Sequence, residues 1–228
     1  MPRASPDVPP ITDSALALRA ATLEPGMSWA LGEPEDDVLL YVAAGAGILS
    51  LAETSEPVRG GRAGLVLAGE EALLQATDPL ELLVMSVGPG VDRHAPMGPR
   101  ALTASLEDAD KGQATGTRSF RVLFDATNGS TRATLFAGYV PPGNAPWHYH
   151  LYDEIVWVPE GPGRLHVAET VEELGPGSAF RLRPREGHIV ENTSAERELT
   201  IIGLFTPAGS PSAAYLTSEV AAEYRFAG

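Results

Sequence analysis

Short apolar runs separated by glycine and proline recur in the same order in both halves of this chain, and this repeat constrains its fold most. The segment LELLVMSVGP in the first half matches ELTIIGLFTP in the second. The matched landmarks lie about 113–118 positions apart, and they are Pro25-Gly26 with Pro142-Gly143, Asp36-Asp37 with Asp153-Glu154, Gly45 with Gly161, and Gly64 with Gly177. A self-similar pattern at one period is the sign of a duplicated structural unit, so the chain is predicted to hold two copies of one unit.

The length of the apolar runs favours strands over helices. Most are 4–8 residues long, as in VLLYVAA, GLVLAG and DEIVWVP, and the chain has 24 glycines and 20 prolines to form turns. Alanine and leucine also favour helix, but the breakers recur too often for helices. We expect an all-β protein of two tandem barrels. Two short helices are also predicted, one around Leu102–Asp108 and one at the C-terminus, capped by Thr217 or Ser218.

The repeat and a change in composition divide the chain. We predict a first barrel over residues 1–98, a linker over 99–117 that is polar and rich in small residues, and a second barrel with the closing helix over 118–228. Four prolines among residues 1–14 predict an extended arm, which is either loose or laid on an edge or a partner subunit.

Composition excludes several classes of function. The net charge of −14 opposes binding to nucleic acid or an anionic membrane. There is no cysteine, so any metal must be held by histidine and carboxylate. The N-terminus has no apolar signal region and no stretch approaches 18 apolar residues, so we expect a cytoplasmic protein.

The stretch WHYHLYDEIVWVPEG concentrates the chemistry of the chain. Side chains alternate along a strand, so His148 and His150 face one way, and Glu154 is expected to open the next strand beside them. His188, in PREGHIVEN, adds a third imidazole from a later strand. Three nitrogens and one oxygen suit one divalent transition metal, namely Mn, Fe, Ni, Zn, Co or Cu. An octahedral metal would keep two positions for water, oxygen or substrate, which points to catalysis.

Residues around these four supply candidates for the substrate pocket. Val156 and Val158 share the face of Glu154 and would form an apolar floor, while Trp157 faces away. For Arg183 two interpretations stand, contact with an anionic substrate or a solvated outer face. Asn192 either hydrogen-bonds a metal-bound water or caps a turn. His94 and His166 have no partner at ligand spacing and are predicted to be a surface and a plain strand histidine.

The first copy of the unit lacks the histidines. No histidine occurs before His94, and the positions of His148 and His150 fall on Leu31 and Glu33 or on Gly32 and Pro34, depending on a one-residue gap. We therefore predict that the first barrel binds no metal and stabilises, dimerises or covers the second.

These motifs resemble those of the cupin superfamily. The first family motif corresponds to Gly143-NAPW-His148-Tyr-His150-LYD-Glu154-IVWVPE-Gly161, with one residue missing after the glycine. The second corresponds to Gly177-SAFRLR-Pro184-REG-His188-IVE-Asn192, with its proline one residue late. The resemblance implies a bicupin of two jelly-roll barrels, with His148, His150, Glu154 and His188 as metal ligands in the second.

The resemblance leaves the reaction open, because cupins include oxygenases, decarboxylases, isomerases, hydrolases and binding proteins. The first hypothesis is a metal-dependent oxygenase of the quercetinase-like type, an oxidoreductase with Glu154 as ligand and proton acceptor. The second is a non-catalytic small-molecule or sugar-binding cupin, and the third is an isomerase or hydrolase that uses the metal as a Lewis acid. A small-molecule substrate and a homodimer are the expected partners.

Overall fold

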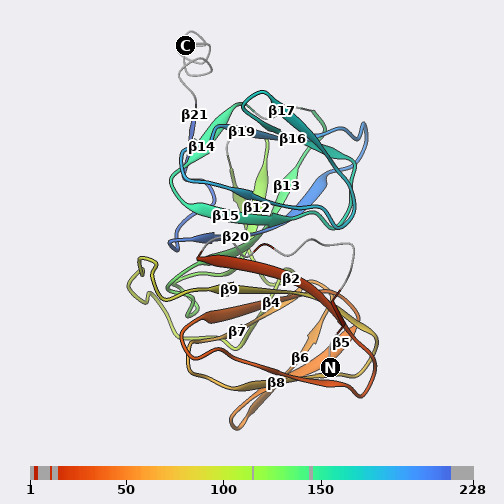
Figure 1. The fold of residues 1–228 in the computed structure, drawn as a ribbon, viewed down its shortest axis with the longest axis vertical. Helices are drawn as coiled ribbons and strands as arrows, with labels where there is room; N and C mark the ends of the chain where they lie inside the picture. The colour runs from red at the N-terminus through yellow and green to blue at the C-terminus, as the bar shows by residue number, and fades with distance from the viewer. Residues whose placement is uncertain (1–2, 5–10, 12–14, 115, 144–145, 217–228) are drawn as a thin grey trace.

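The protein is built from strands, and Figure 1 shows two barrels, one above the other along the long axis. The computed structural model describes all residues except 1–2, 5–10, 12–14, 115, 144–145 and 217–228. Among the residues so described there is no helix, and therefore no helix that could cross a membrane. The predicted all-β class and its two jelly-roll barrels are confirmed.

The first barrel is made of two sheets. The larger has the order β1-β2-β9-β4-β7-β10 and the smaller β3-β8-β5-β6. Their strands are β1 (Arg3–Ala4), β2 (Leu16–Leu23), β3 (Ser28–Leu31), β4 (Asp37–Ala44), β5 (Ala46–Leu51), β6 (Thr54–Arg59), β7 (Arg62–Val66), β8 (Ala72–Ala76), β9 (Leu80–Val87) and β10 (Thr103–Ser105).

The second barrel repeats this arrangement, with sheets β11-β12-β13-β20-β15-β18 and β17-β16-β19-β14-β21. The order β2-β9-β4-β7 recurs as β13-β20-β15-β18, and β3-β8-β5-β6 recurs as β14-β19-β16-β17. Its strands are β11 (Lys111–Gln113), β12 (Ser119–Phe124), β13 (Thr134–Val140), β14 (His148–His150), β15 (Asp153–Trp157), β16 (Gly163–Val167), β17 (Thr170–Leu174), β18 (Ala179–Leu182), β19 (His188–Asn192), β20 (Leu199–Thr206) and β21 (Ala214–Leu216). The duplicated unit read from the sequence is therefore present in the fold.

The larger sheets of the two barrels pack against each other. In β4, Leu39 and Tyr41 belong to a buried cluster shared by both barrels, whereas Val38 and Leu40 point into the first barrel. In β15, Ile155 and Trp157 join the shared cluster. A strand buried on both faces needs apolar residues at every position, which explains the unbroken run VLLYV. Trp157 thus faces away from the second barrel's interior, as predicted.

The stretch 99–117 differs from the prediction of a linker with a short helix. Thr103–Ser105 pair with Gly64–Arg62 of β7, and Leu102 is buried in the interior of the first barrel. Lys111–Gln113 pair with β12 of the second barrel. Pairing at two exposed sheet edges outweighs the weak helix preference of this segment, so the helix around Leu102–Asp108 is not formed. The domain boundaries at 98/99 and 117/118 stay a prediction.

The described parts of both termini lie at sheet edges. Arg3–Ala4 pair with β2, and Ile11 forms a bridge with Leu18, so the described part of the arm lies on an edge of the first barrel. The predicted C-terminal helix and its caps fall within 217–228, outside the described residues. The last described residues, Ala214–Leu216, form a strand beside β14.

Candidate metal centre

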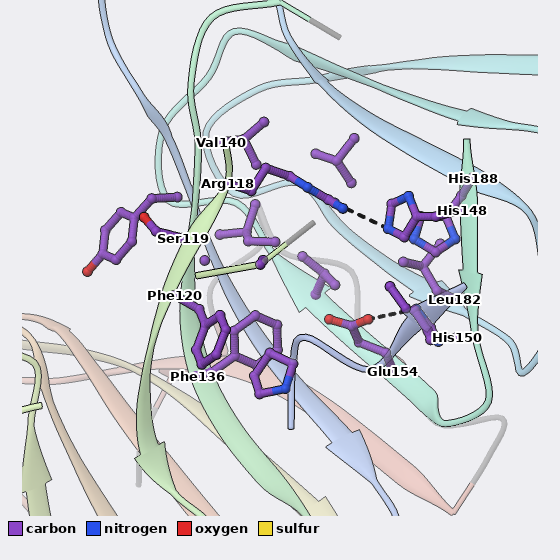
Figure 2. Close-up of a pocket in the computed structure, with 18 of the residues that line it drawn as sticks. Arg118, Ser119, Phe120, Phe136, Val140, His148, His150, Glu154, Leu182 and His188 are labelled. Carbon is purple, nitrogen blue, oxygen red and sulfur yellow. Dashed lines mark hydrogen bonds and ion pairs between the residues drawn. The ribbon is translucent and has the colours of Figure 1, made fainter. Parts of the chain in front are cut away.

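The four predicted ligands lie together inside the second barrel (Figure 2). His148 and His188 are directly paired across β14 and β19, with their ring centroids 4.4 Å apart, and the rings of His150 and His188 are 4.9 Å apart. Glu154 enters from β15, and all four residues are 2–4% exposed. Strand alternation therefore brings three imidazoles and one carboxylate to one buried pocket.

Each of the three histidines uses one ring nitrogen to contact the backbone. The Nδ1 atoms lie 2.9–3.0 Å from the carbonyl oxygens of Pro146 (for His148), Tyr152 (for His150) and Glu186 (for His188). A carbonyl only accepts, so each Nδ1 carries the proton and donates it. The Nε2 atom of each neutral ring then keeps its lone pair, and orienting bonds of this kind are typical of histidines that bind metals.

Burial keeps two of these rings neutral. It lowers the pKa of His148 to about 2, assisted by the nearby positive charge of Arg118, and lowers the pKa of His188 to about 4. Neutral imidazole is the form that binds a metal.

His150 and Glu154 approach each other without a hydrogen bond. Nε2 of His150 lies 2.9 Å from Oε2 of Glu154, yet this buried nitrogen has no hydrogen-bond partner. With the proton on Nδ1, both facing atoms are acceptors. Two ligands at right angles on one metal with bonds of about 2.1 Å would lie about 3 Å apart, so this separation fits a shared cation.

Arg118 was not anticipated as part of this site. It directly precedes β12, and its Nη1 lies 3.2 Å from Nε2 of His148. A guanidinium only donates, so the nitrogen accepts this bond. As they stand, no three or more His, Cys, Asp or Glu side chains among the described residues are positioned to hold a metal ion. Burial lowers the pKa of Arg118. Nothing in the sequence indicated this role, because Arg118 directly follows the expected linker and lies outside both histidine motifs.

Tyr152 is a second residue that the sequence did not single out. Its ring stacks on His150 and on Phe205, with centroids 4.0 Å apart in both pairs, and it lines the pocket. Burial raises the pKa of Tyr152. Its carbonyl also accepts the bond from His150, so Tyr152 holds that imidazole both through its ring and through its backbone.

A glycine gives Glu154 the space it occupies. A Cβ atom on Gly203 of β20 would lie 2.4 Å from a ring carbon of Phe136 and 2.9 Å from Oε1 of Glu154. Any other residue at this position would have to displace one of these side chains.

The walls of the pocket are mainly apolar and its volume is about 60 Å³. That volume holds only a few water molecules or a small organic molecule. The apolar part of the wall comes from Phe120, Phe136, Val140, Val156, Leu182, Val190 and Ile201.

Of the four predicted pocket residues, only one lines the pocket in the structure. Val156 lines the pocket, whereas Val158 packs in the barrel's core cluster. Asn192 donates to the carbonyls of Val140 and Arg197 and accepts from the backbone of Ser194, so its amide organises a loop. Arg183 is exposed outside the pocket lining.

The remaining histidines lie elsewhere, as predicted. His94 is exposed, and His166 contacts Glu191 at 2.7 Å on the outer face of its sheet. Asp153 also points away from Glu154, because it forms a two-bond pair with Arg181 at 2.8 Å.

The strand register corrects the matching of the two copies. Asp37 pairs with Val87 as Asp153 pairs with Thr206, at the ends of equivalent strands, so Asp37 corresponds to Asp153 and Val38 to Glu154. The expected match of Asp37 with Glu154 was wrong by one residue.

The same register locates the other ligand positions in the first barrel. Leu31 pairs with Ala72 as His148 pairs with His188. Leu31, Val38 and Ala72 all lie in the apolar core of the first barrel. Three of the four ligand positions are therefore apolar there, which supports the expectation of a barrel without a metal.

Comparison with known proteins agrees with this architecture. Residues 136–205 match the cupin domain family. L-ectoine synthases of Rhodococcus opacus and Rhodococcus jostii are each 40% identical over 63 residues, 27% of this chain and 46% of theirs. The matched part thus spans about half the length of these relatives.

Solved structures are similar over nearly the whole chain. An oxalate decarboxylase mutant from Bacillus subtilis superposes with a TM-score of 0.73 at 15% identity, covering 92% of this chain and 75% of that one. AerE from Microcystis aeruginosa gives 0.72 at 11% identity, covering 90% and 96%. At such identities the likeness is evidence of fold. Residues 136–205 thus match a cupin domain, and the two barrels of the same topology give the chain a bicupin fold.

Proposed function

We propose that this protein is a metal-dependent enzyme that acts on a small organic molecule inside the second barrel. The observation that carries the proposal is the convergence of His148, His150, His188 and Glu154 in a buried, apolar-walled pocket, with all three Nδ1 atoms tied to carbonyls. Buried polar groups of this kind are costly unless something pairs with them, and a divalent cation would pair with all four.

In this proposal each side chain has a defined task. A bound transition metal supplies a Lewis acid that polarises a substrate oxygen. The imidazoles of His148, His150 and His188 and the carboxylate of Glu154 would hold it, and Glu154 would also accept a proton. Val156 and its apolar neighbours exclude water from the reacting atoms.

Two reaction classes are proposed for this site. The first is an oxygenase-type reaction, for which a metal held by the four residues would supply the activation of oxygen. The second is a reaction without net oxygen use, an isomerase, hydrolase or lyase, and the lyase is favoured because the similar structures are named oxalate decarboxylase. A homodimer and a cytoplasmic location remain predictions.

Metal content and oxygen balance test the proposal. The protein purified without chelator is expected to hold about one Mn, Fe, Co, Ni, Cu or Zn ion per chain, and metal removal should abolish turnover. Small organic acids would be screened with an oxygen electrode and a carbon dioxide assay in parallel. Oxygen uptake identifies the oxygenase class, and product without oxygen uptake identifies the second class. A protein without metal and without turnover would instead be a binding cupin.

A further inference from the structure

Arg118 places a positive charge inside the candidate metal pocket. Figure 2 shows its side chain reaching across the pocket to His148. Glu154 lies below them in this view and lines the same pocket. Nη1 of Arg118 lies 3.2 Å from Nε2 of His148. That nitrogen has one lone pair, so it cannot accept from Arg118 and bind a metal at the same time.

The charges of the pocket do not balance once a metal is present. Among the described lining residues only Arg118 and Glu154 carry a charge at neutral pH, +1 and −1. A divalent cation raises the net charge of the pocket from zero to +2, since metal-bound imidazoles are neutral. Positive charges close together in an apolar pocket repel strongly, so an anion is needed to stabilise them.

A carboxylate meets this need by charge, shape and size. A guanidinium presents parallel N–H donors that match the two oxygens of a carboxylate, and carboxylate oxygens are also ligands for divalent metals. The cavity of about 60 Å³ admits only a small one.

We propose that the substrate is a small carboxylate that binds between Arg118 and the metal, and that Arg118 couples the two binding events. The carboxylate accepts the hydrogen bonds of the guanidinium, and Nε2 of His148 becomes available to the metal. Carboxylate binding therefore strengthens metal binding, and by linkage the metal strengthens carboxylate binding to the same degree. This inference rests on the proposed metal site.

Cobalt titration with and without acetate tests the coupling. The protein is stripped of metal and titrated with Co²⁺ by calorimetry or visible absorption, in acetate or in acetamide at equal ionic strength. For the unaltered protein, acetate should tighten Co²⁺ binding by about 5-fold or more, in the usual range of coupling, whereas uncharged acetamide should have no effect.

Two variants identify the residue responsible. Arg118→Gln keeps a hydrogen-bond donor but removes the charge, so it should bind Co²⁺ more tightly without acetate and lose the response to acetate. Arg183→Gln removes an arginine outside the pocket and should behave like the unaltered protein. Circular dichroism establishes that both variants are folded.

The outcomes separate the two claims. Equal Co²⁺ affinity of the unaltered protein in acetate and in acetamide would overturn the proposed coupling. A response to acetate that persists in Arg118→Gln would overturn it as well. Both results leave the metal site intact. Failure of the unaltered protein to bind Co²⁺ in any buffer would contradict the proposed metal-dependent function itself.

Discussion

Val38 occupies in the first barrel the position that Glu154 occupies in the second, directly after an aspartate that begins the equivalent strand. Val38 packs among leucines in the barrel interior, and Glu154 faces three histidines. One fold thus uses the same strand position for packing in one copy and for a charged site in the other.

Restoring a carboxylate to the first barrel should destabilise it. Val38→Glu would bury a charge with no partner, and we expect the free energy of unfolding to fall by about 3 kcal/mol or more. Val171→Glu makes the same change at a position 56% exposed and should alter stability by less than about 0.5 kcal/mol. Urea denaturation of both variants measures the difference, and equal stability would contradict the proposed burial of Val38.

Removing ligands should remove metal from the second barrel. His150→Ala or Glu154→Ala is expected to weaken metal binding by at least about 100-fold, because each takes away a donor atom. His94→Ala and His166→Ala, outside the pocket, should retain the metal. Elemental analysis after gel filtration checks all four, and full occupancy in the Glu154 variant would refute the four-ligand assignment.

Gly203 should control the position of Glu154. Gly203→Ala would place a methyl group 2.4 Å from Phe136 and 2.9 Å from Glu154, so we expect metal affinity to fall about 10-fold or more. Gly90→Ala has nothing within 4 Å of the added carbon and serves as the control. Unchanged Co²⁺ affinity in the Gly203 variant would show that Glu154 tolerates displacement.

A buried ion pair connects the two barrels. Arg132, from the second barrel, donates to the carbonyls of Glu35 and Val87 in the first, and its Nε lies 3.5 Å from Asp37. Arg132→Met would leave Asp37 buried without a charged partner, at an expected cost of about 3–5 kcal/mol.

The exposed pair of Arg59 and Glu107 provides the control for this change, since its side chains are 62% and 73% exposed. Arg59→Met should cost no more than about 1 kcal/mol. Thermal unfolding compares the two variants, and similar midpoints would argue against a stabilising role for Arg132.

The interface between the barrels should weaken in alkali. Burial, with the nearby Tyr139, raises the pKa of Tyr41 from 10 to about 12. As pH rises, Tyr41 loses its proton at lower pH in the unfolded chain than in the folded one. Its contribution to the free energy of unfolding is therefore intact below pH 10 and declines between pH 10 and 12, by up to about 1.4 kcal/mol per pH unit. In urea titrations over this range, Tyr41→Phe should make the free energy of unfolding fall less steeply with pH. An unchanged slope would mean that other groups cause the decline.

Local sequence pattern determined much of this protein. Breaker spacing predicted short strands, and the repeat predicted two barrels. Alternation along a strand placed His148 and His150 on one face of their strand, and Trp157 opposite Glu154 on the next. These properties follow from the two-residue period of a strand, which acts between neighbours in the chain.

Tertiary structure decided what depends on residues far apart in the chain. Pairing with β7 made residues 103–105 a strand where the sequence favoured a helix, and the register showed that Val38, rather than Asp37, stands in for Glu154. Only the folded barrel brings Arg118 to His148, thirty positions away, because closure of the sheets sets that distance and no periodicity in the sequence encodes it.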